Sequence, residues 1–99
     1  MKISIVDKPS QRRLVVEGKL IAPWAAELKR AWREAAADLN GRELLIDVKD
    51  LTAISEDGEN VVLELMKEGA RFRSSGVFTK QVLKRLARKV RSDVEEAKR

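Results

Sequence analysis

The side chains most capable of chemistry are carboxylates in the middle of the chain. Asp47 and Asp50 lie around the end of a predicted buried strand, and Glu56 and Asp57 follow closely. Carboxylate oxygens at such a place could hold a hard cation, because ligands of open α/β sheets often bind near strand ends. The more ordinary role of Asp47 and Asp50 is to accept hydrogen bonds from loop backbone N–H groups. We expect that role, and therefore no metal site.

The residue types that are missing narrow the chemistry further. The 99 residues include no cysteine and no histidine. Disulfides, thiolate nucleophiles, Cys/His zinc sites and histidine acid–base catalysis are therefore excluded. The sequence also lacks a Gly-x-Ser-x-Gly elbow, a P-loop and a Gly-x-Gly-x-x-Gly motif. We expect a protein that is not an enzyme and that binds no cofactor.

The segment 55–60 reads as the start of a helix. A serine before a helical stretch can accept a hydrogen bond from a backbone N–H group of the first turn, so Ser55 is the predicted cap. Glu56, Asp57 and Glu59 then place negative charge where the helix dipole favours it. This local role leaves the same side chains available for a surface contact.

Charge is segregated along the chain, which the net value of +5 hides. Residues 43–68 hold eight acidic and two basic side chains, whereas residues 71–91 hold eight basic side chains and no acidic one. Four of these cations share one helical stripe: Lys80, Lys84, Arg88 and Arg91. A solvated helix face is the first interpretation, and an acidic protein partner, including a second copy of the chain, is the next. Nucleic acid or anionic lipid comes third, because no aromatic side chains are interleaved with the cations.

Seven elements must position these residues, and turn signals separate them. Pro and Ser follow the first strand, Pro23 suits the first position of a helix, and Asn-Gly and Gly end the first two helices. Continuous apolar residues predict that the third strand is buried on both faces. The order is β-β-α-β-α-β-α, with strands at 3–6, 13–20, 43–48 and 70–73 and helices at 23–39, 56–68 and 80–91.

This order predicts an α/β fold with a mixed, mostly parallel four-stranded sheet and helices mainly on one face. For the last helix we expect Thr79 as the N-cap, with Phe78 and Leu83 as a hydrophobic staple, and Ala87 on the buried face. The aromatic side chains should lie in or beside the core, although Trp24, in the first helical turn, could instead mark an exposed interface.

The length fits one domain, which we place at residues 1–92, followed by a charged tail at 93–99. The first residues do not have the pattern of a signal peptide, and no apolar run approaches the length of a transmembrane helix. The cytoplasm is the expected location.

Three stretches resemble the STAS family, which is named after sulfate transporters and bacterial anti-sigma factor antagonists. The resemblance covers about residues 2–90. Its stretches are 14–20 (LVVEGKL), 45–58 (LIDVKDLTAISEDG), and 68–72 (EGARF) with 82–86 (VLKRL). Anti-sigma factor antagonists normally read Asp-Ser-Ser-Gly or Asp-Ser-Thr-Gly at the helix start. A partner kinase phosphorylates the residue before that glycine.

This chain departs from the pattern at that position. Asp57 is the phosphoacceptor equivalent and cannot be phosphorylated, while Ser55 replaces the first aspartate. Asp57 could mimic a phosphorylated state or be a plain contact residue, and modification of Ser55 is disfavoured because it is displaced by two positions. Family members also commonly continue with another strand and helix.

The resemblance implies a non-catalytic protein-interaction module that binds an anti-sigma factor or a related kinase-fold regulator. The expected contact residues are Ser55, Glu56, Asp57, Gly58, Glu59 and Asn60. The main alternative is an accessory STAS subunit of a larger assembly, such as a membrane transport complex. A polyanion-binding protein that uses the cations of residues 80–91 is a weaker alternative.

Overall fold

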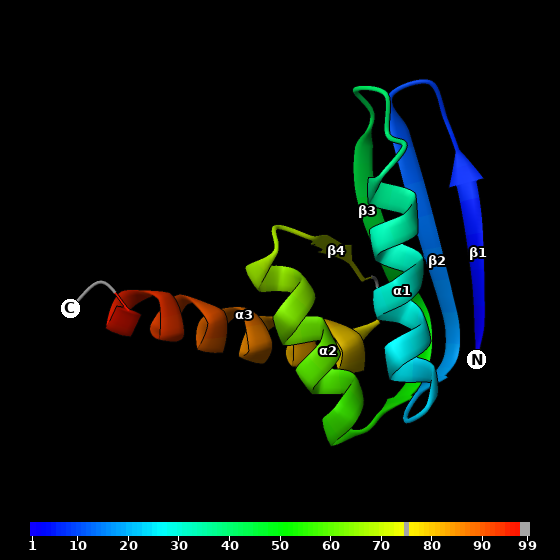
Figure 1. Cartoon of the computed structure of the whole chain (residues 1–99). Coiled ribbons are helices and arrows are strands. Elements are labelled where there is room, and N and C mark those ends of the chain that lie inside the picture. Colours follow the sequence, from blue (N-terminus) through cyan, green and yellow to red (C-terminus); the bar gives the residue numbers. More distant parts are fainter. Residues whose placement is uncertain (75, 98–99) are drawn as a thin grey trace.

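A computed structural model describes the backbone of residues 1–74 and 76–97, and their side chains except those of Lys49 and residues 93–97. The described elements follow the expected order (Figure 1). Their bounds are β1 Lys2–Asp7, β2 Gln11–Leu20, α1 Trp24–Ala36, β3 Glu43–Ile54, α2 Glu56–Lys67, β4 Arg71–Arg73 and α3 Val77–Ala97. None of the described helices is both long and apolar enough to cross a bilayer.

The sheet is mixed, and its strands lie in the order β1-β2-β3-β4. β1 and β2 form the expected antiparallel hairpin, whereas β2, β3 and β4 run parallel and are linked through α1 and α2. The register sets Leu14 beside Ile46 and Ile46 beside Phe72. Because register partners share a face of the sheet, these three apolar side chains mark the face that the helices cover. The predicted fold class is therefore confirmed.

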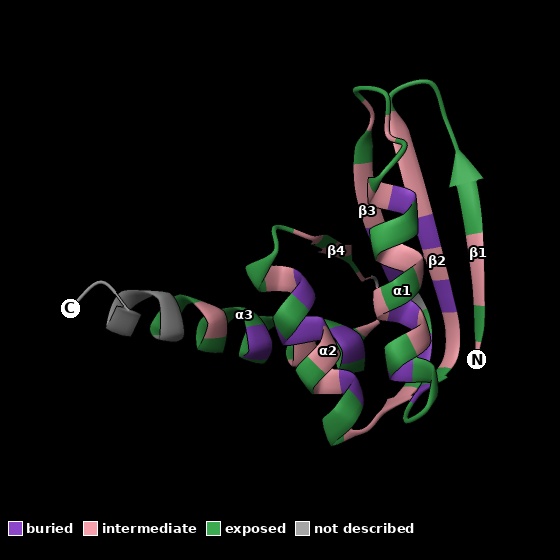
Figure 2. Cartoon of the chain, in the orientation of Figure 1, coloured by how far each residue is buried: buried purple, intermediate pink, exposed green. Residues whose placement is uncertain are grey.

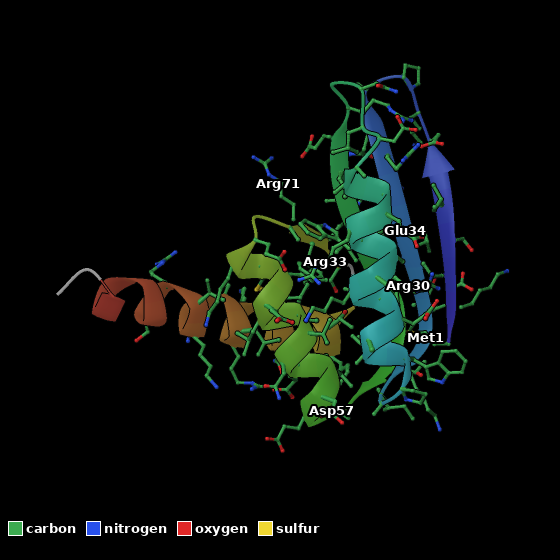
Figure 3. All side chains as sticks on the ribbon, in the orientation of Figure 1. Met1, Arg30, Arg33, Glu34, Asp57 and Arg71 are labelled. Carbon is green, nitrogen blue, oxygen red and sulfur yellow. The ribbon has the colours of Figure 1, made fainter. Side chains whose placement is uncertain are left out.

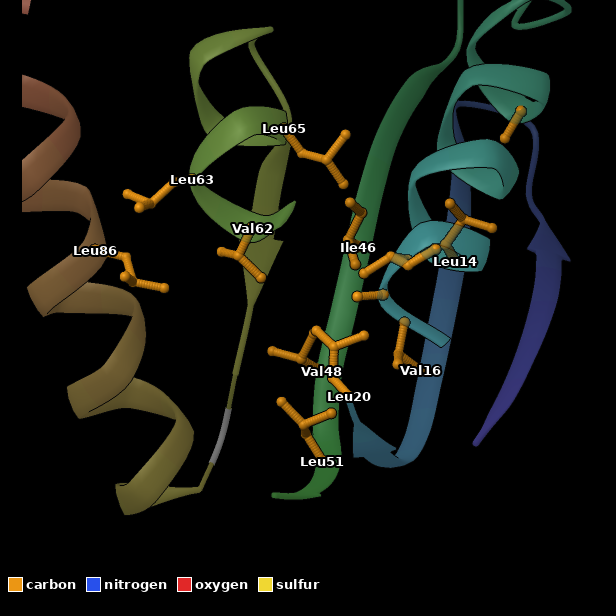
Figure 4. Close-up of a cluster of buried hydrophobic side chains, with 13 residues drawn as sticks. Leu14, Val16, Leu20, Ile46, Val48, Leu51, Val62, Leu63, Leu65 and Leu86 are labelled. Atoms are coloured by element: carbon orange, nitrogen blue, oxygen red, sulfur yellow. The ribbon is translucent and has the colours of Figure 1, made fainter. Parts of the chain in front are cut away.

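The core lies between that face and the helices (Figure 4). Leu14, Ile46, Leu65 and Leu86 come from β2, β3, α2 and α3, and each is almost fully excluded from solvent. Burial of apolar side chains supplies most of the stabilising free energy, at about 25 cal/mol for each Å² removed from water. Exposed residues collect on β1 and on the outer sides of the helices (Figure 2).

β3 is longer than the predicted strand 43–48. The continuous apolar run predicts a strand that ends at Val48, with Asp47 and Asp50 around its end. The strand instead continues with alternating burial, since Leu51 is buried while Asp50 and Thr52 are exposed. Two register shifts in the pairing with β2 accommodate this extension, which reaches Ile54.

Both ends of α3 differ from the prediction. The helix begins at Val77, and the Lys80 N–H donates to the Gly76 carbonyl over 2.9 Å. Thr79 therefore does not cap the helix: it lies in the first turn, where its buried hydroxyl donates to the same carbonyl and lies against Ser74 Oγ. Phe78 is half exposed, so the predicted staple with Leu83 is wrong.

Ala87 is exposed rather than buried, while the helical backbone continues through Ala97 into the predicted tail. Residues 98–99 lie outside the described part of the chain. Figure 1 shows that the C-terminal half of α3 projects beyond the sheet. Only the first half of this long helix is thus placed to complete the core.

α1 is shorter than predicted, because it ends at Ala36 and the chain turns before Asn40. Asn40 and Gly41 have φ angles of 51° and 83°, which is the left-handed conformation that an Asn-Gly pair tolerates. The Asn-Gly pair therefore forms a turn four residues beyond the helix and does not end the helix itself. Trp32 and Phe72 pack partly buried against the core as expected.

Candidate partner-binding surface

Three helices begin along one edge of the sheet. β2, β3 and β4 are parallel, so their carboxyl ends meet at the same edge, and α1, α2 and α3 follow these ends. Crevices at such edges are common binding places in α/β folds. The segment 55–60 lies at the middle of these three helix starts, between the exposed first residues of α1 and α3.

Ser55 fixes the start of α2 as predicted. Its φ and ψ angles are −90° and 174°, and its Oγ accepts a hydrogen bond from the Gly58 N–H over 3.2 Å. The Ser55 N–H in turn donates to the Leu20 carbonyl over 3.0 Å. These bonds satisfy groups that a helix start leaves open and tie α2 to the end of β2.

Gly58 is part of the framework rather than of the exposed surface. It is buried against the end of β2, and a Cβ atom at this position would lie 2.3 Å from the Leu20 carbonyl oxygen and 2.9 Å from Ile54 Cγ1. No side chain fits that space. The backbone of α2 therefore approaches β2 as closely as it does because residue 58 is glycine.

Glu59 is also engaged within the chain. Its Oε1 lies 2.9 Å from Arg85 Nη1, which joins α2 to α3. The hydrogen bond from Arg85 lowers the pKa of Glu59; partial burial opposes this effect, and the nearby charges of Arg85 and Lys89 reinforce it. Glu59 therefore keeps its charge to a lower pH than an ordinary glutamate does, and it is only partly available to a partner.

The remaining predicted contact residues are free to bind. Glu56, Asp57 and Asn60 are exposed, and Asp57 projects from the end of α2 in Figure 3. In the described part of the chain, neither the Glu56 nor the Asp57 carboxylate accepts a hydrogen bond or forms an ion pair. The six predicted residues thus divide into an exposed trio and three residues that hold the helix start in place.

A groove of about 420 Å³ runs beside Asp57 and Asn60. Its other walls come from the residues just before α1, from α1 itself and from α2: Ala22, Pro23, Ala25, Ala26, Lys29 and Val61. Trp24, whose exposure was an open alternative, is 43% exposed, and Ile21 before it is 36% exposed. Lys29 and the alanines of α1 were not predicted here, since nothing in the sequence shows which faces of α1 and α2 meet.

The structure separates the carboxylates that were considered as cation ligands. Asp47 lies within β3 and not in a loop, it is only 2% exposed, and its Oδ2 is 3.9 Å from Arg13 Nη1. Asp50 is exposed further along the same strand. Neither residue lies in a loop, because β3 continues past both of them. The described residues contain no group of three acidic side chains placed to hold a metal ion.

The basic stripe of α3 is exposed as predicted. Lys80, Lys84, Arg88 and Arg91 all face solvent, and none of them pairs with a carboxylate among the described residues. Arg85, which is not on this stripe, is the α3 cation that reaches the acidic start of α2. Part of the segregated charge is therefore neutralised within the chain.

Comparison with known proteins supports the fold and goes no further. No protein-family model matches the sequence, and no curated protein matches it. A crystal structure of a protein named Mglu superposes with a TM-score of 0.57 over 74% of this chain and 19% of Mglu, at 14% identity. The structure of Mglu in its native form gives a TM-score of 0.51 over 74% of this chain and 22% of Mglu, at 15% identity. This chain thus spans about a fifth of the length of those structures, and what they share with it is the arrangement of strands and helices.

Proposed function

We propose that this chain is a non-catalytic protein-interaction module of the STAS type. It binds an anti-sigma factor or a related kinase-fold regulator, as an anti-sigma factor antagonist does. The observation that carries the proposal is the start of α2, where the exposed trio Glu56, Asp57 and Asn60 stands on a capped helix beside a groove. A partner can therefore meet these side chains without reordering the backbone, which lowers the entropic cost of binding.

The mechanism is partner switching without a covalent switch. Asp57 occupies the place of the family's phosphoacceptor, and its carboxylate supplies about one negative charge permanently, compared with about 1.5 to 2 for a phosphate group. Docking of the exposed trio on the regulator would release the sigma factor that the regulator holds. The fraction of the regulator that is bound is then set by the amount of this protein and not by its phosphorylation.

Co-purification followed by affinity measurement tests the proposal. The tagged chain of 99 residues should recover a kinase-fold or anti-sigma protein from native lysate. With that purified partner, Asp57→Lys should weaken binding by at least tenfold in calorimetry, because the substitution reverses a charge at the centre of the surface. Asp38→Lys is the matched control, since Asp38 is exposed beyond the opposite end of α1, and it should bind as the unmodified chain does.

Other results would support the alternatives. Recovery of a membrane transport complex whose affinity does not change with Asp57→Lys would favour the accessory-subunit role. Binding to duplex DNA or anionic vesicles that falls steeply with salt, and that is lost in Lys84→Glu, would favour polyanion binding by α3. In either case the anti-sigma proposal would be rejected.

A further inference from the structure

β1 forms the long open edge of the sheet. It pairs with β2 on one side only, so backbone N–H and C=O groups along its outer side have no strand beside them. Proteins normally protect such edges with proline, bulges, inserted charges or very short strands. β1 has six residues, contains no proline and pairs with β2 without a register shift, whereas β4 at the opposite edge has three residues.

The charges of β1 protect it poorly. They lie at its ends, Lys2 and Asp7, and the four residues between them are uncharged. Asp7 is also turned to its own chain, because its Oδ1 accepts hydrogen bonds from Arg12 Nε over 2.7 Å and from Arg42 Nη1 over 2.8 Å. Lys2 is therefore the one charged side chain of β1 that could oppose pairing with another strand.

The same edge exposes apolar side chains. Ile5 is the register partner of Leu14 and therefore points to the helix-covered face. Leu14 is fully buried, yet Ile5 is 56% exposed, because α1 packs over β2 and does not extend to the edge (Figures 1 and 2). Val6, on the opposite face of the strand, is 40% exposed.

We propose that β1 is a dimerisation edge, at which β1 of a second copy pairs antiparallel around a twofold axis through Ser4. In this register Ser4 lies opposite the second Ser4, and Ile3 lies opposite Ile5 of the other copy. The cross-strand isoleucines cover the apolar surface that α1 leaves open, and the outer backbone groups of both strands gain partners. The two sheets join into one continuous sheet.

The composition of β1 favours this register over its neighbour. In an antiparallel pair the twofold axis passes between one residue and the same residue of the other copy. The helix-covered faces of both copies then lie on the same side of the joined sheet. An axis through Ile5 would set Ile3 opposite the Asp7 carboxylate, which would bury a charge or separate it from Arg12. The axis through Ser4 leaves both Asp7 side chains beyond the five-residue pairing. The interface also uses none of the exposed trio Glu56, Asp57 and Asn60, so the dimer and the proposed partner binding fail or succeed independently.

A matched pair of cysteine variants tests the register directly, because the chain has no cysteine of its own. Ser4→Cys places two thiols opposite each other and should give a disulfide-linked dimer on mild oxidation. Ser10→Cys is the control: it lies in the exposed turn after β1, at least about 25 Å from its mate in this arrangement at about 3.3 Å per strand residue. It should remain monomeric under the same conditions.

Sedimentation velocity supplies the second measurement. The unmodified chain should show a concentration-dependent dimer. Ile5→Lys should raise its dissociation constant by at least tenfold, because each lysine then lies opposite Ile3 of the other copy and diagonal to the second lysine on the same face. Ile21→Lys, at an exposed isoleucine outside β1, should leave the constant unchanged, and circular dichroism should show that both variants fold. A chain that stays monomeric at its highest soluble concentration would overturn the proposal, as would equal crosslinking of Ser4→Cys and Ser10→Cys or a dimer that Ile5→Lys does not weaken.

Discussion

At the scale of single residues, the start of α2 combines one feature that was predictable with one that was not. A serine before acidic residues and an apolar run is a local signal, so Ser55 could be assigned as the cap from the sequence. Gly58 was assigned only as part of a motif. Its physical role depends on the Leu20 carbonyl, which is 38 positions away in the chain and becomes a neighbour through the sheet.

Gly58→Ala should therefore destabilise the fold, although alanine favours helices more than glycine does. The new Cβ would lie 2.3 Å from a backbone oxygen that cannot move alone, so α2 must shift away from β2 at a cost of about 1–3 kcal/mol. Urea denaturation followed by circular dichroism measures this free energy.

Asn60→Ala is the control for Gly58→Ala, since Asn60 is exposed in the same helix, and it should change stability by less than about 0.5 kcal/mol. If Gly58→Ala were as stable as the unmodified chain, the close approach of α2 to β2 would not be a packing constraint.

At the scale of elements, helix and strand types followed from periodicity, whereas several ends depended on contacts between elements. β3 runs on to Ile54 because β2 continues beside it, and α3 begins before Thr79 because the Gly76 carbonyl accepts the first helical hydrogen bond. The exposed arc of α3 carries its cations, and Glu59 of α2 pairs with one of them, Arg85. This ion pair joins α2 to α3, whereas the sequence showed only that the two helices begin in segments of opposite charge.

A double-mutant cycle should measure this link. Glu59→Gln and Arg85→Gln, singly and together, should give a coupling of about 0.2–1 kcal/mol at pH 7, because both side chains are partly exposed. The pKa of Glu59 is lowered in the folded state, so its contribution is complete above the ordinary glutamate pKa of about 4.3 and is lost as the pH falls below that value.

The coupling should therefore shrink when the cycle is repeated at about pH 3, and it should also shrink in high salt. The pair Arg30 and Glu34 within α1 is a suitable comparison, since Nη1 and Oε1 are 3.1 Å apart and both side chains are exposed. A Glu59–Arg85 coupling of zero at pH 7 would mean that the pair does not hold α2 against α3.

At the scale of the whole molecule, α3 completes a core that the sheet and two helices leave open. Leu86 is 1% exposed and belongs to the same buried cluster as Val48 and Val62. The C-terminal half of α3 projects beyond the sheet (Figure 1). The contacts that pack this helix against the core therefore lie in its first half.

Leu86→Ala should destabilise the protein by about 2–4 kcal/mol, because it removes a buried side chain and leaves a cavity. Lys84→Ala, at an exposed position one half-turn earlier, should be within about 0.5 kcal/mol of the unmodified chain. Chemical denaturation measures the free energy of unfolding of the two variants. Equal stabilities would show that α3 is held by surface charge and not by the core.

The sequence by itself determined the order of the elements, the α/β class, the helix cap at Ser55 and the separation of acidic from basic segments. These properties follow from neighbours in the chain: apolar spacing sets helix or strand, and capping and turn residues act within a few positions. Only the tertiary structure decided which of the residues 55–60 are exposed, that Lys29 lines the groove beside them, that Asp47 lies inside a strand, and that β1 is left with an open apolar edge. Each of these depends on which elements pack side by side, because exposure and ion pairing are set by residues far apart in the sequence.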